Sequence, residues 1–111
     1  MNFSVVVIGH PEQTQASYSA WRFCQAALLK QHQIVRVFFL HDATYQAVLN
    51  NELSTDWQAL AKHYQFDLDV CVTAAERRGL GAEDLQTGFQ ARGLGQLVDA
   101  SMAAERTITF R

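Results

Sequence analysis

Residues 3–8 read Phe-Ser-Val-Val-Val-Ile, and the turn-forming residues 9–11, Gly-His-Pro, follow at once. A run of β-branched and apolar residues without polar alternation is typical of a parallel strand that helices cover on both faces. Residues 14–30 then carry apolar side chains at helical spacing, and Thr14 is the expected N-cap. Residues 34–40, Ile-Val-Arg-Val-Phe-Phe-Leu, repeat the buried-strand pattern. The sequence therefore predicts a strand–helix–strand unit at the start of the chain.

The same alternation continues to the C-terminus. We expect a short helical piece at residues 43–49, a helix from Ser54 as its cap to Tyr64, a strand at 66–72, helical turns at 73–78, a short strand at 85–89, a helix at 94–104 and a strand at 107–110. Strands that alternate with helices give a parallel sheet with right-handed crossovers. The predicted fold class is α/β, a flavodoxin-like three-layer sandwich with a mainly parallel sheet, and residues 1–111 form a single domain.

The composition of the 111-residue chain limits its function classes. Hydrophobic residues make up 49% and charged residues 18%, a balance that is typical of a globular domain. The net charge of −2 leaves no basic stripe for a phosphate backbone, so we expect no direct nucleic-acid partner. No run suits a secretory leader or a membrane span, so we expect no membrane contact and a cytoplasmic location.

The chain has two cysteines, Cys24 and Cys71. Cytoplasmic thiols stay reduced, so we expect no structural disulfide. There is no Cys-x-x-Cys, the four histidines have no ligand spacing, and neither a P-loop nor Gly-x-Gly-x-x-Gly occurs, so we expect no metal and no cofactor. Cys24 lies on the apolar stripe of the first predicted helix, where a core filler is expected and a resolving thiol is the alternative.

Functional residues of parallel sheets gather where the strands end at their carboxyl side. This rule selects the segments 9–10, 41–43 and 71–73. Cys71 ends the third predicted strand and leads into a predicted helical turn, whose unpaired N–H groups would favour a thiolate. We therefore expect Cys71 to be partly accessible and more acidic than a free cysteine. The alternative is a buried, inert cysteine, since free cysteine is among the most buried residue types.

Three further side chains could stabilise an anion near Cys71. Arg77 and Arg78 follow it within the next turns and would add positive charge if their side chains fold back. His10 follows the first strand at the same expected edge, and it could bind an anion or assist proton transfer. The alternatives are a solvated arginine pair and a loop histidine without a special task.

Residues 69–79, Asp-Val-Cys-Val-Thr-Ala-Ala-Glu-Arg-Arg-Gly, resemble the cysteine motif of the DsrE family, and most closely that of its TusD/DsrE sulfur-relay subunits. Residues 6–19, 37–39, 85–89 and 93–97 are similar as well, so that the resemblance covers essentially the whole chain. Two segments depart from the family pattern. The segment between Gly79 and Leu85 is shorter than expected for the tRNA-branch subunit, and residues 11–13 lack the family's glycine-containing turn.

The resemblance implies a flavodoxin-like fold and a heterohexamer with sister DsrE-family subunits of the TusB/TusC or DsrF/DsrH kind. It also implies a sulfurtransferase in which Cys71 accepts persulfide sulfur from a TusA-like donor and passes it to a TusE/DsrC-like acceptor. In the tRNA branch, which we take as the expected pathway, the sulfur ends in 2-thiouridine at the wobble position. The alternatives are a sulfur-oxidation DsrE-type subunit, a homo-oligomeric DsrE-like protein, and a non-catalytic scaffold subunit.

Overall fold

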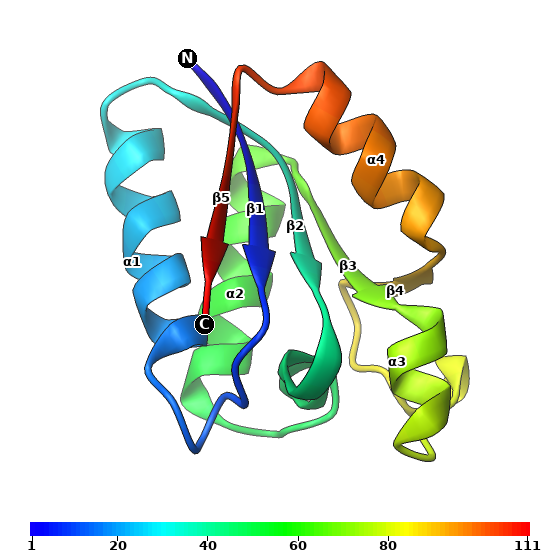
Figure 1. Ribbon diagram of the computed structural model, residues 1–111. Coiled ribbons are helices and arrows are strands. Elements are labelled where there is room, and N and C mark those ends of the chain that lie inside the picture. Colours follow the sequence, from blue (N-terminus) through cyan, green and yellow to red (C-terminus); the bar gives the residue numbers. More distant parts are fainter.

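Five strands, all parallel, form the central sheet of the computed structural model, which describes residues 1–111 (Figure 1). The strands are β1 (Asn2–Val7), β2 (Gln33–Phe39), β3 (Asp67–Cys71), β4 (Phe89–Arg92) and β5 (Arg106–Phe110), and they lie in the order β4-β3-β2-β1-β5. The α-helices are α1 (Ala16–Leu29), α2 (Glu52–Tyr64), α3 (Val72–Arg77) and α4 (Leu94–Ala103), and the 3-10 helices are η1 (His41–Ala47) and η2 (Ala82–Asp84). The predicted α/β class and its three layers are confirmed.

The path of the chain explains the layers. From β1 the chain moves outward to β4 and then returns to β5 beside β1. Because parallel crossovers are right-handed, this reversal places α4 on the face of the sheet opposite to α1 and α2 (Figure 1). The larger apolar core, which includes Val5, Phe39 and Val70, fills the space under α1 and α2. Phe38 and Cys71 belong to a smaller apolar cluster, against which Leu97 of α4 packs.

Both predicted helix caps are wrong by a few residues. α1 begins at Ala16 after Gln15, and Thr14 acts one position earlier, where its hydroxyl accepts a hydrogen bond from the Ala16 N–H at 3.2 Å. Asn51 caps α2, because its side chain accepts a hydrogen bond from the Ser54 N–H at 2.9 Å. Ser54 lies inside the helix and is buried.

The prediction of a strand at residues 85–89 is also wrong, because β4 begins only at Phe89. Gly88 has a φ of 96°, a left-handed conformation that interrupts an extended segment before that point. The helical piece predicted at residues 43–49 begins earlier, at His41, and ends at Ala47. Only Leu40 separates the carboxyl end of β2 from η1, and this places His41 beside the site described below.

A buried hydrogen-bond network joins α1, η1 and α2. The Trp57 indole N–H donates to the Ser17 hydroxyl at 3.0 Å, and this hydroxyl donates to the Gln46 side-chain oxygen at 2.7 Å. The Gln46 amide in turn donates to the Ser54 hydroxyl. All four residues are almost completely buried. The network therefore fixes η1, which carries one wall of the candidate site, against the two helices of the main core.

None of the helices combines the length and the apolar character that crossing a membrane requires.

Candidate active site

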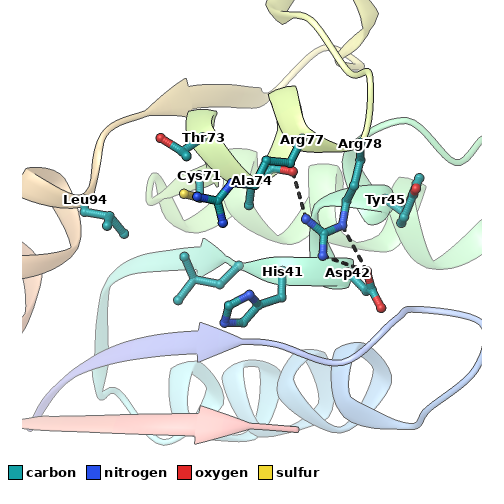
Figure 2. Close-up of a pocket in the computed structure, with 10 residues that line it drawn as sticks. His41, Asp42, Tyr45, Cys71, Thr73, Ala74, Arg77, Arg78 and Leu94 are labelled. Carbon is teal, nitrogen blue, oxygen red and sulfur yellow. Dashed lines mark hydrogen bonds and ion pairs between the residues drawn. The ribbon is translucent and has the colours of Figure 1, made fainter.

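Cys71 is the last residue of β3 and immediately precedes α3. Phe38 and Ala74 pack with it, Leu97 lies against the same cluster, and only 4% of Cys71 is exposed. The sequence predicted a more accessible thiol, and the difference arises because α4 covers this face of the sheet. Cys71 nevertheless lies on the wall of a surface pocket of about 710 Å³, through which a reactant could approach it (Figure 2).

The pocket lies at the carboxyl edge of the sheet and is lined by residues of η1, β3, α3 and α4 together with the residues that directly follow β2 and α3. These are Leu40, His41, Asp42, Tyr45, Cys71, Thr73, Ala74, Arg77, Arg78 and Leu94 (Figure 2). The strand-end rule selected two of the segments that meet here, 41–43 and 71–73. It missed Tyr45, in the second turn of η1, and Leu94, the first residue of α4, because their positions depend on how these helices pack.

The two arginines of the cysteine motif differ in their contacts. Arg78 donates from Nε to Asp42 Oδ1 at 2.9 Å and from Nη1 to the Ala74 carbonyl oxygen at 2.9 Å, and its Nη2 forms an ion pair with Asp42 Oδ1 at 2.8 Å (Figure 2). Arg78 thus joins α3 to η1 across the pocket. Arg77 lines the same pocket, is exposed, and makes no hydrogen bond or ion pair within the chain. Of the two, Arg77 is the cation that remains free to meet an anion.

His10 does not line the pocket. Its ring packs at 5.3 Å from the ring of Tyr45, and its Nδ1 accepts a hydrogen bond from the Glu12 N–H at 3.0 Å. His10 therefore lies behind a pocket residue, and the histidine on the pocket wall is His41. The segment containing His41 was selected from the sequence, but His10 was the histidine named for anion binding, and the structure separates it from Cys71.

Cys24 has the surroundings of a core residue, as the sequence predicted. It is completely buried in α1 within the main apolar cluster. Burial raises the pKa of the Cys24 thiol to about 12, because a thiolate there would lose its hydration. Cys24 is therefore not a nucleophile at neutral pH. No group of three or more histidine, cysteine or acidic side chains converges in a way that could hold a metal ion.

Residues 1–110 match the DsrE/DsrF-like family, a match that includes the whole sheet and the pocket. The chain belongs to this family. It is 37% identical over 128 aligned positions to "Putative sulfurtransferase DsrE" of Allochromatium vinosum, and the alignment covers 99% of this chain and 98% of that relative. The family relationship supports sulfur transfer as the class of activity of this DsrE-like chain.

Two solved structures share its fold. The ychN protein from E. coli superimposes with a TM-score of 0.86 at 16% sequence identity, and 99% of each chain is covered. The protein of unknown function MTH1491 from Methanobacterium thermoautotrophicum gives a TM-score of 0.75, also at 16% identity, with 98% of this chain and 99% of that chain covered. At such low identities these similarities concern the fold alone.

The free charge of Arg77 can be tested on the thiol. We expect Arg77→Gln to slow alkylation of Cys71 at neutral pH by about two- to fivefold. The reason is that attraction between an exposed cation and a nearby anion, here the Arg77 guanidinium and the reacting thiolate, stabilises the anion by about 0.5–1 kcal/mol. Alkylation by iodoacetamide, followed by mass spectrometry in a Cys24→Ala background, measures this rate. Arg78→Gln is the matched control for stability, since it breaks the link to Asp42 and should lower the urea midpoint of unfolding. An alkylation rate that Arg77→Gln leaves unchanged at low salt would contradict the assignment.

Proposed function

We propose that this chain is a persulfide-carrying sulfurtransferase subunit and that Cys71 holds the sulfur. The main support for this proposal is that the Cys71 thiol lines a pocket that also contains an unpaired cation, Arg77. The other thiol, Cys24, is sealed in the core. Membership of the DsrE/DsrF-like family supports the same chemistry.

The transfer step needs only thiol chemistry. The Cys71 thiolate attacks the terminal sulfur of a donor persulfide, a new S–S bond forms, and the donor cysteine leaves as a thiolate with the electron pair of the broken bond. The sulfur is then carried as a Cys71 persulfide. Its negative charge lies in the pocket, where Arg77 can stabilise it. An acceptor thiolate completes the relay by attacking the same outer sulfur, and Cys71 leaves as a thiolate.

The partners follow from the family resemblance. We propose a TusA-like donor, a TusE/DsrC-like acceptor, and sister DsrE-family subunits of the TusB/TusC or DsrF/DsrH kind. The relay would end either in 2-thiolation of the tRNA wobble uridine or in sulfur oxidation, and the similarity to a putative sulfurtransferase does not distinguish the two pathways. In both cases the chain itself needs no contact with nucleic acid, and no cofactor takes part.

The test of this function follows one sulfur atom through the protein. After incubation with a persulfide-loaded TusA-like donor, the intact chain is expected to gain the mass of one sulfur atom. Addition of a TusE/DsrC-like acceptor should remove it. A chain that stays unloaded while the donor is competent towards a known acceptor would refute the proposal. Comparing a tRNA-branch acceptor with a sulfur-oxidation acceptor would then identify the pathway.

The low exposure of Cys71 favours a second candidate function, that of a non-catalytic subunit that only builds a complex. At 4% exposure the thiol is reached only through the pocket, and a scaffold would need no reactive thiol at all. The two functions differ in the loading experiment, because a scaffold subunit never gains the mass of a sulfur atom. It would, however, still be required for loading of its sister subunits.

Assembly with other DsrE-family chains can be tested on α4. Leu94, Val98 and Met102 follow one another at four-residue spacing on this helix and are 54%, 55% and 81% exposed. A contiguous apolar stripe of this kind is typical of a protein interface, and it begins at a pocket residue. We expect Val98→Lys with Met102→Lys to reduce the sedimentation coefficient of the chain, alone or with sister subunits.

The control for this prediction is Leu29→Lys, which changes an apolar residue of α1 that is 69% exposed and lies outside the stripe. This variant should sediment like the unaltered chain. If the unaltered chain is a monomer in both conditions and still transfers sulfur, the expected oligomer does not exist.

A further inference from the structure

A buried carboxyl group lies two residues before the candidate nucleophile. The side chain of Asp69, on β3, is completely buried. Its Oδ2 accepts a hydrogen bond from Arg36 Nη1, and the two groups form an ion pair. Its Oδ1 is buried without any hydrogen-bond partner. A buried carboxylate oxygen without a partner is energetically costly, so a position that retains one invites a functional explanation.

Asp69 and Cys71 project from the same face of the sheet. Alternate residues of a strand share a face, and neighbouring side chains on that face stand roughly 6.5–7 Å apart. Phe38 of β2 is the register partner of Asp69 and also packs against Cys71 under α4, which places both residues on the α4 side. A carboxylate at this separation in the protein interior repels a second negative charge, because the low dielectric there screens the two charges only weakly.

The charges around this pair come from every element that borders it. They are Arg36 on β2, Asp67 on β3, Arg92 on β4, Arg77 on α3 and Arg78 directly after it, and His41 and Asp42 on η1. α4 contributes only Asp99, which is exposed. Arg36 binds Asp67 as well, with Nη2 at 3.2 Å from Asp67 Oδ2, so its positive charge is shared between two carboxylates. Burial raises the pKa of Asp69, and Arg36 opposes this rise.

We propose that the Asp69–Arg36 pair is a positioning element that opposes formation of the Cys71 thiolate and so makes Cys71 retain a sulfur atom that it has accepted. The proposal rests on the proposed function of Cys71. Hand-over breaks the S–S bond of the Cys71 persulfide, and the electron pair of that bond stays on Cys71 Sγ while the acceptor thiolate forms the new S–S bond. The leaving thiolate then lies close to Asp69. Since less acidic thiols leave more slowly, the carboxylate delays discharge until a strong acceptor is in place.

The first test measures the pH midpoint of Cys71 alkylation by iodoacetamide in a Cys24→Ala background. Asp69→Asn keeps the shape of the side chain and an acceptor for Arg36 but removes the charge, and it should lower the midpoint by about one pH unit. Arg36→Gln removes the compensating cation and should raise the midpoint. Asp67→Asn is the matched control, because Asp67 pairs with the same arginine but has a half-exposed side chain, and it should change the midpoint little.

The second test measures discharge of loaded protein to an excess of a small thiol such as glutathione. For a leaving thiol that is one unit more acidic, transfer should be about threefold faster, so Asp69→Asn should release its sulfur about threefold sooner. Equal midpoints for Asp69→Asn and the parent protein, or shifts of Asp69→Asn and Arg36→Gln in the same direction, would overturn the proposal, because loosening of the fold alone cannot give opposite signs.

A variant that fails to fold does not end the experiment. Arg36→Lys keeps the cation and should retain a midpoint close to that of the parent protein, so the pair Arg36→Lys and Arg36→Gln tests the charge effect without a change at Asp69. The alkylation readout is also independent of sulfur loading. Failure of the parent protein to accept sulfur would refute the proposed function, whereas unchanged midpoints would refute only the coupling of Asp69 to Cys71.

Discussion

Replacement of Cys71 by serine is expected to abolish sulfur loading completely. Serine keeps the size and position of the side chain at the end of β3, so the pocket and the free Arg77 should remain. A hydroxyl group, however, is far less acidic than a thiol and forms no persulfide with a sulfane donor. Incubation with a persulfide-loaded donor and intact-mass measurement should show no added sulfur in Cys71→Ser, and the donor should stay loaded.

The matched control is the other cysteine. Cys24→Ala removes a thiol that burial keeps protonated at neutral pH and avoids placing a hydroxyl in the apolar core. It should load to the same extent as the parent protein and lose only a little stability. If Cys24→Ala abolished loading in a folded protein while Cys71→Ser loaded normally, the assignment of the carrier cysteine would be reversed.

The buried strands were predictable from the sequence because their signal is local. Residues 3–8 and 34–40 are largely apolar on both faces, and residues 66–72 alternate the apolar Phe66, Leu68 and Val70 with acidic residues. Each of the three segments overlaps an observed strand of the sheet centre. β4 lacks this signal. It is an edge strand of four residues, Phe-Gln-Ala-Arg, of which only Phe89 is buried. The pattern of its sequence does not differ from that of a loop, and the left-handed Gly88 just before it defines its start.

The candidate site was predictable only where its residues follow strand ends. Cys71 is the last residue of β3, and His41 lies two positions after the end of β2, so the topology alone brings them to one edge. The different roles of Arg77 and Arg78 could not be predicted, because they depend on which guanidinium reaches Asp42 of η1. For the same reason the contact of Asp69 with Arg36 is invisible in the sequence, since 33 positions separate the two residues.

The wrong helix caps have a similar origin. Serine and threonine are good caps wherever their hydroxyl can reach a free N–H group, so Thr14 and Ser54 both suited the role in the sequence. Asn51 precedes Ser54 by three positions and takes the cap of α2. The Ser54 hydroxyl is used instead in the buried network, where it donates to the Gln46 carbonyl oxygen at 2.8 Å. A long-range contact thus overrides a local preference.

That network leads to the largest stability effect that we expect, at Trp57. Trp57 is completely buried, its ring meets Phe39 edge-on at a centroid distance of 5.5 Å, and its indole N–H donates to Ser17. Trp57→Ala removes all three contributions and leaves a cavity under the sheet. Such truncations cost about 3–5 kcal/mol, a large part of the roughly 5–15 kcal/mol that stabilises a domain of this size. We expect a correspondingly lower free energy of unfolding in urea.

Trp21→Ala is the control, because Trp21 is also an indole donor but only partly buried. Its N–H donates to the Asp56 carbonyl oxygen at 3.1 Å on the outer side of the α1–α2 contact. Replacing Trp21 should lower the free energy of unfolding clearly less than replacing Trp57.

The loss of Trp57 also matters for the site, since Trp57 supports η1 through Ser17 and Gln46, and η1 carries the pocket wall opposite Cys71. Trp57→Phe, which keeps most of the volume but not the donor, should fold, lie between the parent protein and Trp57→Ala in stability, and expose Cys71 to faster alkylation. Equal losses for Trp57→Ala and Trp21→Ala, or an unchanged alkylation rate in Trp57→Phe, would show that the buried network does not hold the pocket in place.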